Sequence, residues 1–503
     1  MTMYDFAFAG SGFAASVAAA VLQKQGYQCL LLEKQQHPRF TIGESSTPIA
    51  DQILLDLAED FQLPSLGSLA RWKTAAQIPE VTVGCKQGFS YFFHQREVSE
   101  PVYRLLVPAS PNQEAADSHW LRSSVDHFLV QHAVSQGAEL QENTQVQDLQ
   151  RTDQGWTLQL KTPAGSRRCE AKFVIDSSGS AALGPWLEAA PVSRPLETQS
   201  ACVYAHFEKE VDWEKQWQQW NLQSDDFSFP AQHAAIHHVV ADGWLWHLGF
   251  DNHRISLGWV LSLPHTKNLP TDSVSQDSLL CWWRERLANY PSLQSLYGNL
   301  RPITPFKYLP HLQRLTFPSA GDGWLALPSA AGFVDPLHST GIAHSMTAVQ
   351  KLVYHTAAEG IPQTTFLNRY WQQLQREFWV LDQLAAMAYS SLDDPLKWEC
   401  ATMIYFAAAI QMEEARDRRR NSKSDSQSGL PIGAQLSSPP SFLLADDPLW
   451  LDRVARARQL LKRRSPPSTG WLAATADILD GYNSAGLAQS AANGIYHYTT
   501  ANK

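Results

Sequence analysis

The sequence is poor in cysteine and lacks the residue spacings of a metal site. Only 6 cysteines occur among its 503 residues, and none forms a Cys-x-x-Cys pair or a Cys/His cluster with zinc spacing. Scattered single cysteines in a large chain are typical of a reducing compartment. The adjacent histidines His237 and His238 are expected on a strand, where neighbouring side chains point to opposite faces. We therefore expect no bound metal.

The sequence also lacks an excess of basic charge and long apolar runs. The net charge of −9 makes the chain a poor partner for nucleic acid or an anionic membrane surface. The first residues, Met1–Asp5, lack the basic region of a signal peptide, and the early apolar run Ala14–Leu22 is too short to span a bilayer. These features predict a cytoplasmic protein without a membrane span.

Apolar and aromatic residues, in contrast, are abundant. Hydrophobic residues make up 44% of the sequence and charged residues 18%, which predicts a globular protein with a large core. The chain also has 18 tryptophans. We expect most of them in the core and some in the lining of an aromatic ligand pocket. The length predicts two to four structural units.

The N-terminal residues have the pattern of a βαβ unit. Residues 4–9 form an apolar run typical of a buried strand, residues 16–25 are helix-like, and residues 28–33 form a second apolar strand. Gly26 is a candidate helix C-cap. Strands that alternate with helices predict a parallel sheet at this end of the chain.

A glycine-rich turn follows the first strand. Gly10, Gly12 and Ala15 have the Gly-x-Gly-x-x-Gly/Ala spacing. Gly10 permits the tight turn, Gly12 lets the backbone approach a pyrophosphate, and Ala15 lets the helix pack against the strand. Glu33 ends the second strand, where a carboxylate can hold a ribose hydroxyl. The pattern predicts a dinucleotide site; the alternative is a glycine-rich turn in an unrelated α/β protein.

Three other segments and one arginine resemble features of flavin-dependent halogenases and their reductase relatives. The segment His37–Ser45 resembles the one that runs beside the flavin, and Arg122 matches an arginine near the cofactor. Asp176–Gly179 resembles the second nucleotide-contacting turn of that family. Pro328–Leu337 is a third segment that matches the family, but it has Pro328-Ser329 where relatives usually have Gly-Asp. The resemblance therefore implies FAD as the cofactor.

The segment Gly243–Phe250 resembles the Trp-x-Trp-x-Ile-Pro signature of the halogenases. Both tryptophans, Trp244 and Trp246, are present, but Leu248-Gly249 replaces Ile-Pro. On a strand, Trp244, Trp246 and Leu248 would share one face. The resemblance implies that this element separates the flavin from the substrate; the alternative is a pair of core tryptophans.

Lys86 lies in the segment Gly84–His94, which is most similar to the phenol-type halogenases. The resemblance implies an essential lysine here. Reduced flavin, oxygen and halide give hypohalous acid, and a buried ammonium group can hold and polarise it beside the ring, or become a haloamine. The alternative is an ordinary surface lysine on a strand.

A turn at 335–342 completes the halogenase pattern. The resemblance implies a halide site at Thr340 and Gly341, where oriented N–H groups hold an anion. His338 stands where tryptophan-specific enzymes have a glutamate, which argues against free tryptophan as the substrate. We expect His338 either to act as a base on an activated ring or to be a hydrogen-bonded packing residue.

The resemblance implies a set of cofactor contacts along the first two thirds of the chain. They are Gly10, Gly12, Phe13, Ala14, Ala15, Glu33, Lys34, Arg39, Gly43, Glu44, Ser45, Arg122, Asp176, Gly179, Asp335, Gly341 and Ile342.

The resemblance also predicts the architecture. We expect an α/β fold with a Rossmann-like FAD-binding domain of the flavin monooxygenase and reductase type, an inserted mixed β-sheet substrate domain and a helical C-terminal region. The FAD-binding domain is expected at residues 1–200 and 300–360, the substrate sheet at 201–299 and the helical region at 361–503. The charged stretch 416–441, which becomes rich in Ser, Gly and Pro, is expected to be a flexible loop.

The expected activity is halogenation of an electron-rich aromatic substrate of the phenol, pyrrole or indole type. It would use FADH2, O2 and chloride or bromide. A second Gly-x-Gly-x-x-Gly motif is absent, so a separate flavin reductase is the expected partner, and the substrate would be free or bound to a carrier. The alternatives are a flavin monooxygenase, a prenyl or carotenoid reductase, and a non-catalytic flavoprotein.

Overall fold

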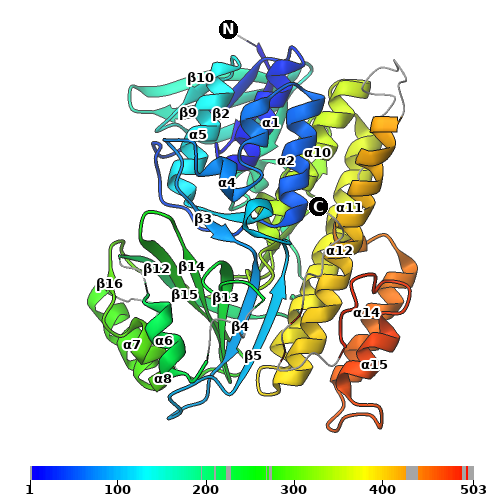
Figure 1. Cartoon of the computed structure of the whole chain (residues 1–503). Coiled ribbons are helices and arrows are strands. Elements are labelled where there is room, and N and C mark those ends of the chain that lie inside the picture. The colour runs from blue at the N-terminus through cyan, green and yellow to red at the C-terminus, as the bar shows by residue number, and fades with distance from the viewer. Residues whose placement is uncertain are drawn as a thin grey trace.

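The computed structural model describes most of the chain. The described residues are 3–193, 195–208, 211–222, 228–267, 269–270, 275–425 (backbone only for 422–425), 440–489, 494 and 496. Figure 1 shows a first sheet with its helices at the top, a second sheet at the lower left, and two long helices along the right side.

The first sheet contains the predicted βαβ unit. Strand β1 (Met3–Ala9) lies between β2 (Cys29–Leu32) and β10 (Gly165–Asp176) and pairs in parallel with both. Its nearly continuous burial is typical of a parallel strand covered on both faces. The other strands of this sheet are β7 (Glu139–Gln141), β8 (Gln145–Thr152), β9 (Gly155–Thr162), β19 (Ala320–Gly321) and β20 (Trp324–Ala326).

Helices pack closely on the first sheet. Helix α1 (Phe13–Lys24) is rich in alanine and buried from Phe13 to Leu22, so it approaches its neighbours closely. It contacts α5 (Arg122–Ser135) and α10 (Thr340–Glu359). Helix α2 (Pro48–Asp60) contacts α10 in turn. The carboxyl ends of β1 and β10 thus meet the beginning of α1, where the predicted dinucleotide site lies.

The second sheet is assembled from separate stretches of the chain. Its order is β16-β12-β15-β14-β13-β4-β5, and β17 also pairs with β12. Although β4 and β5 precede residue 200, they belong to this sheet, because β4 pairs in parallel with β13. The strands are β4 (Gly88–Phe93), β5 (Tyr103–Pro108), β12 (Ser200–Glu208), β13 (Ala234–Val240), β14 (Gly243–Gly249), β15 (Arg254–Ser262), β16 (Arg301–Pro302) and β17 (Lys307–Leu309).

The two faces of the second sheet belong to different cores. Trp244, Trp246 and Leu248 join the large core that also contains the first sheet, whereas Leu245 lies in a smaller core. That smaller core is closed by α6 (Trp213–Gln219), α7 (Gln276–Ala288) and α8 (Pro291–Tyr297). The predicted sharing of one face by the two tryptophans and Leu248 is therefore confirmed.

Short strands connect these units. Strand β3 (Val83–Lys86) pairs with β6 (Asp117–Trp120), and β18 (Arg314–Phe317) pairs with β11 (Ala190–Pro191) and β21 (Gly332–Phe333).

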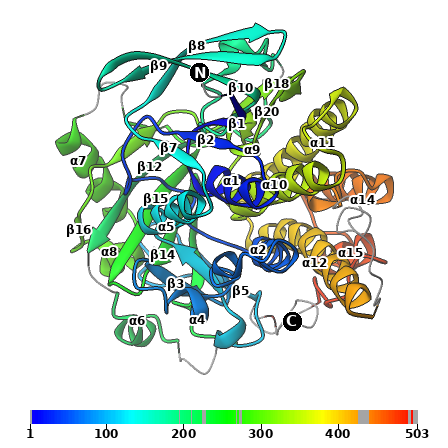
Figure 2. The same cartoon turned by 90° about the horizontal axis from the view of Figure 1, so that it is seen from above.

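The C-terminal region is helical, as expected. Its main helices are α11 (Thr364–Tyr389), α12 (Pro395–Asp425), α14 (Pro448–Leu461) and α15 (Trp471–Ile478). Helix α12 runs along the side of the molecule and lies beside α2, as Figure 2 shows from above. No helix in the described part of the chain is long and apolar enough to cross a bilayer.

The prediction of a flexible loop from residue 416 is wrong for residues 416–425, which continue α12. Arg416 and Arg420 form ion pairs with Asp56 of α2, at 3.1 and 2.8 Å. These charges stabilise the helix against its neighbour instead of marking a solvated loop. Residues 426–439 of the predicted loop lie outside the described residues.

Candidate active site

The glycine turn has the backbone that the motif requires. Gly10 has a φ of 111°, and a Cβ there would lie 2.5 Å from the carbonyl oxygen of Ser177. Gly12 is the N-cap of α1 and offers no side-chain cap. Phe13, Ala14 and Ala15 form the buried first turn. The N–H groups at the start of α1 are therefore available to an anion.

Two arginines lie beside the N-terminus of α1. Arg122, at the start of α5, donates to both carboxylate oxygens of Asp126 at 2.8 and 2.9 Å. Arg39 reaches the same carboxylate at 3.3 Å. A Cβ on Gly12 would lie 3.5 Å from Nη2 of Arg39 and 3.7 Å from Nη2 of Arg122. One buried aspartate thus holds two guanidinium groups beside the helix N-terminus, an arrangement that fits a pyrophosphate.

Glu33 lies at the end of β2 and is engaged with the turn. It accepts hydrogen bonds from Ser11 Oγ at 3.1 Å and Arg39 Nε at 3.0 Å. Burial alone would raise the pKa of Glu33, but the Arg39 charge and the N–H donors outweigh it and hold that pKa below its usual value. The carboxylate is therefore charged at the nucleotide end. Lys34, the next residue, is exposed.

The segment after Glu33 links the two sheets. The carbonyl oxygens of Ile42 and Gly43 accept hydrogen bonds from Arg122 at 2.9 and 3.0 Å. Glu44 is buried, and its carboxylate lies 2.9 Å from Nε2 of His206 on β12. Ser45 forms a bridge with His119. The segment His37–Ser45, which resembles the flavin-adjacent segment of the halogenases, is thus held between Arg122 and the second sheet.

The second nucleotide turn also matches its predicted place. Asp176 ends β10 and accepts hydrogen bonds from the N–H groups of Ser178 and Leu183; burial raises its pKa. Gly179 has a φ of 71° and is exposed. Its carbonyl oxygen accepts a hydrogen bond from Arg314, a residue that the sequence did not single out. Arg314 therefore ties this turn to the neighbouring segment.

Arg314 also stabilises the region where Pro328-Ser329 replaces Gly-Asp. Its guanidinium donates to the carbonyl oxygens of Ser329 and Ala330, in the short helix α9 (Pro328–Ala331). These contacts hold the third predicted flavin segment against the second.

Asp335 lies in a buried hydrogen-bond network. Its carboxyl accepts hydrogen bonds from Ser200 at 3.0 Å and Tyr389 at 2.8 Å. The Tyr389 hydroxyl accepts one from Nε1 of Trp244 at 3.0 Å. Burial raises the pKa of Asp335 to about 7, although the hydrogen bonds oppose the shift. Trp244 is thus linked through the hydroxyl of Tyr389 to the segment that contains Asp335.

The tryptophan pair is closely packed. Trp246 donates to Ser256 Oγ at 3.1 Å, and its ring fills the space beside Gly258, where a Cβ would lie 2.1 Å from a ring carbon. The ring of Trp244 lies 4.9 Å from that of His237, which stacks on Tyr91 at 4.7 Å. His238, on the opposite face, hydrogen-bonds His94 instead. Aromatic rings therefore run from the tryptophan pair along the sheet toward β4.

Lys86 lies at the end of β3 and is fully buried. Its ammonium donates to the carbonyl oxygen of Ser46, just after the flavin-adjacent segment. It also lies 4.2 Å from the centre of the Phe89 ring. Burial, followed by the charge of Lys86, lowers the pKa of His119 to about 3. The predicted surface alternative is therefore wrong, and the lysine is a buried cation at the junction of the two sheets.

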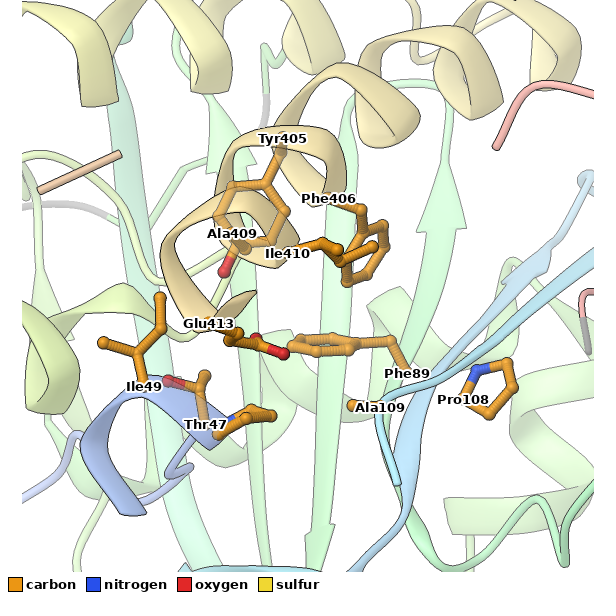
Figure 3. A pocket seen from close by; sticks show the side chains of 11 residues that line it. Thr47, Ile49, Phe89, Pro108, Ala109, Tyr405, Phe406, Ala409, Ile410 and Glu413 are labelled. Carbon is orange, nitrogen blue, oxygen red and sulfur yellow. The ribbon is translucent and has the colours of Figure 1, made fainter. Parts of the chain in front are cut away.

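A pocket lies beside this lysine, between α2, β4 and α12 (Figure 3). The empty space along its walls is about 350 Å³, and part of this space is open solvent. Its lining residues are Thr47, Pro48, Ile49, Phe89, Pro108, Ala109, Tyr405, Phe406, Ala409, Ile410 and Glu413. The walls are mostly apolar and aromatic, which suits a flat aromatic ligand.

His338 lies behind one wall of this pocket, against Tyr405. Its ring is parallel to the ring of Tyr405, with centres 4.1 Å apart, and Tyr405 lines the pocket. Neither ring nitrogen has a hydrogen-bond partner in the described part of the protein. Burial lowers the pKa of His338 to about 3, and His237 adds to the effect. His338 is thus a neutral imidazole. The expectation of a hydrogen-bonded packing residue is not met, because neither ring nitrogen has a partner among the described residues.

The predicted halide turn begins helix α10. Ser339 is the N-cap and has a left-handed backbone, with a φ of 53°. Thr340 and Ile342 are buried, whereas Gly341 is exposed and has open space where a Cβ would lie. The first-turn N–H groups of a 20-residue helix are directed at this place, which suits an anion.

The structure brings the predicted residues together at two centres. One consists of the glycine turn, Arg39, Glu33 and Arg122; the other is the pocket bordered by Lys86 and His338. The pocket residues Thr47, Tyr405 and Glu413 were not predicted. Spacings of one and four residues among the pocket-lining positions of α12 could have indicated a buried helix face.

The first centre fits the ADP half of FAD. The open helix terminus and the paired arginines suit the pyrophosphate, and Glu33 suits the ribose. The segments around Glu44 and Asp335 lead from there to the tryptophan pair and the pocket, where the ring system of the flavin would supply redox chemistry.

Comparisons with known proteins agree with this arrangement. The family model described as tryptophan halogenase matches residues 118–425, and one described as an NAD(P)-binding Rossmann-like domain matches residues 9–58. Monodechloroaminopyrrolnitrin halogenase PrnC of Pseudomonas fluorescens is 24% identical over 444 residues, which cover 84% of this chain and 75% of that protein.

Two further relatives extend the comparison. The 1H-pyrrole-2-carbonyl-(peptidyl-carrier protein) chlorinase of Pseudomonas fluorescens strain Pf-5 is 25% identical over 363 residues, covering 69% of this chain and 74% of that protein. The crystal structure of halogenase PltM in complex with phloroglucinol and FAD has a TM-score of 0.83 at 21% identity, covering 97% of this chain and 98% of that one. This likeness establishes the α/β fold. Because the tryptophan halogenase model spans more than half of the chain, the protein belongs to the flavin-dependent halogenase family, whose members are oxidoreductases.

Proposed function

We propose that this protein uses FADH2, O2 and chloride or bromide to halogenate an electron-rich aromatic ring in the pocket beside Lys86. The observation that carries the proposal is the position of this lysine. It is fully buried, donates to the backbone after the flavin-adjacent segment, and faces the Phe89 wall of the pocket. When bound, reduced FAD supplies the reducing power that turns O2 and halide into hypohalous acid.

The ammonium group of Lys86 would hold and polarise the hypohalous acid, because an N–H donor in a buried site acts strongly on a polar oxygen. The rings between the tryptophan pair and Phe89 would keep the flavin away from the substrate. The first-turn N–H groups at Thr340 and Gly341 would hold the halide.

His338 would act in the neutral form. With a pKa of about 3 in the folded protein, its imidazole can accept a hydrogen bond from a substrate or from water, but it takes up a proton only weakly. We therefore assign His338 to orientation near the ring and not to strong general-base catalysis.

Related proteins support the class of substrate. Their names include a pyrrole-2-carbonyl group on a carrier protein, and PltM was crystallised with phloroglucinol. Both rings are electron-rich. We propose a phenolic, pyrrolic or indolic substrate here, free or carrier-bound, and a separate reductase as the source of FADH2.

The test is bromination with chemically reduced FAD, oxygen and bromide, with no reductase present, against a panel of phenols, pyrroles and indoles. Mass spectrometry should detect brominated product that depends on FADH2 and bromide. A β-diketone that traps hypobromous acid is run in parallel. Hydroxylated product without trapped hypobromous acid would instead identify a monooxygenase and contradict the proposal.

A further inference from the structure

We propose that His237 is a positioning residue of the halide site. Its imidazole N–H holds the halide turn, residues 335–342, so that the first N–H groups of α10 can bind the halide. This inference rests on the proposed halogenase function and adds a residue of the second sheet to it. The sequence singled out His237 and His238 only as a pair of adjacent histidines, and the proposed function uses neither.

His237 connects the second sheet to the halide turn. It lies on β13 and is 2% exposed, and its Nε2 lies 3.0 Å from the carbonyl oxygen of Leu337. Leu337 precedes Ser339, the N-cap of α10, by two residues. A hydrogen bond at this carbonyl group therefore acts on the backbone that leads directly into the helix.

The carbonyl group of Leu337 depends on this side chain for a hydrogen bond. Leu337 is fully buried, and no backbone N–H of the described residues donates to its carbonyl oxygen. A buried carbonyl group without a hydrogen bond costs free energy. A donor from His237 at this place therefore stabilises the turn.

The imidazole of His237 is neutral and has a single N–H to donate. Burial lowers the pKa of His237 to about 3, although nearby backbone carbonyl groups oppose the shift. Its Nδ1 lies 3.1 Å from the carbonyl oxygen of Ala235, which is a paired residue of the ladder between β13 and β4. Leu337 lies in a turn, outside any strand or helix. We therefore assign the N–H to Nε2, where it satisfies the carbonyl group of Leu337.

Two aromatic rings fix the orientation of this imidazole. The centre of the His237 ring lies 4.7 Å from that of Tyr91 and 4.9 Å from that of Trp244. These rings come from β4 and β14, the strands on either side of β13. An imidazole packed between them cannot turn its Nε2 away without moving a neighbour. The N–H is therefore presented at a fixed place.

The halide turn needs such restraint because its backbone is unusual. Ser339 has a φ of 53°, a conformation that a residue other than glycine keeps only when its surroundings hold it there. The N–H of Leu337 donates to the carboxylate of Asp335 at 3.0 Å. The carbonyl oxygen of His338 accepts a hydrogen bond from the hydroxyl of Tyr405, also at 3.0 Å. Several contacts thus share the task of fixing this turn.

The contact from His237 is the one that ties the middle of the turn to the second sheet. Ser200 of β12 bonds to Asp335, at the start of the turn. His237 bonds to Leu337, two residues nearer to α10. Fixing the backbone there keeps the first N–H groups of the helix directed at one point, as the binding of an anion requires. Without this hydrogen bond we expect weaker binding of the halide.

The experiment compares His237→Gln with His237→Met. The two side chains are similar in length, but glutamine keeps an amide N–H near the place of Nε2, whereas methionine has no N–H donor. His238→Met is the matched control, because His238 is the next residue on the strand but points to the opposite face and hydrogen-bonds His94. Each protein receives chemically reduced FAD, oxygen and varied bromide, and the β-diketone traps the hypobromous acid that forms.

His237→Met should raise the KM for bromide about 3- to 10-fold, the usual effect of losing one hydrogen bond, with a smaller change in kcat. His237→Gln and His238→Met should keep this KM within about twofold of the wild-type value. A KM for bromide that stays at the wild-type value in His237→Met, or that rises equally in His238→Met, overturns the inference.

Hydrogen exchange tests the same contact without any catalysis. The amide groups of Leu337 and Ser339 are hydrogen-bonded, so their exchange, measured by mass spectrometry on peptides that cover the halide turn, reports whether the turn is held. This exchange should be about 3- to 10-fold faster in His237→Met than in the wild type and in His238→Met. Equal exchange in all three proteins overturns the inference.

Two further results keep the test decisive. If His237→Met does not fold, His237→Phe replaces it, because a phenylalanine ring can pack between Tyr91 and Trp244. The same changes are then expected, and their absence overturns the inference. If the wild type forms no hypobromous acid at any bromide concentration, the proposed function fails, while hydrogen exchange still decides whether His237 holds the turn.

Discussion

Replacing His338 with phenylalanine tests whether the imidazole of His338 is buried and neutral, as the structure indicates. The ring of His338 is parallel to that of Tyr405 with centres 4.1 Å apart, and a phenylalanine can keep this stack. It removes two ring nitrogens that have no hydrogen-bond partner in the described residues. The substitution therefore isolates the cost of burying an imidazole.

The magnitude follows from proton linkage. Burial lowers the pKa of His338 from 6.5 to about 3, so between these values the unfolded chain binds a proton that the folded protein does not. The free energy of unfolding of the wild type thus falls as the pH drops below about 6.5. The loss from this one residue is about 1.4 kcal/mol at pH 5.5 and about 2.7 kcal/mol at pH 4.5, and it is negligible at pH 7.5.

Urea unfolding of both proteins at pH 7.5 and pH 5.5 measures this difference. The free energy of unfolding of His338→Phe minus that of the wild type should be about 1.4 kcal/mol larger at pH 5.5 than at pH 7.5. A difference between the two proteins that does not change with pH would refute the assignment of a buried, neutral imidazole.

Two other substitutions test the cofactor end and the tryptophan pair. Asp126→Asn should weaken FAD binding about tenfold or more, because a neutral amide holds the Arg122 guanidinium less firmly; an unchanged Kd by flavin fluorescence would contradict this. Gly258→Ala places a Cβ 2.1 Å from the Trp246 ring and should lower the free energy of unfolding by about 1–3 kcal/mol or more. Denaturant unfolding checks it, and a stability equal to wild type would show that the pair is loosely packed.

Local features were predictable from the sequence. The βαβ unit depends on short-range patterns, and the shared face of Trp244 and Trp246 follows from the period of a strand. The positions of Gly10 and Gly12 followed from backbone geometry, since a side chain cannot fit the turn at Gly10.

Features that depend on distant pairing were not predictable. Phe89 of β4 pairs with Ala235 of β13, and no local pattern shows that a strand so early in the chain belongs to the second sheet. The end of α12 looked like a loop because Arg416 and Arg420 are charged, but Asp56 on another helix neutralises them. The sequence did not single out Glu413 for the same reason, because its position in the pocket wall depends on the distant segments that pack against α12.

The most direct test of the account is the effect of Lys86→Ala on product and on flavin oxidation, measured together. Lys73→Ala is the matched control, because Lys73 is half-exposed and pairs with Glu114 at the surface. Lys86→Ala should reoxidise FADH2 at the wild-type rate and form trapped hypobromous acid, but lose at least about 99% of brominated aromatic product. Lys73→Ala should match the wild type. Bromination that persists in Lys86→Ala at the wild-type rate would contradict the central claim.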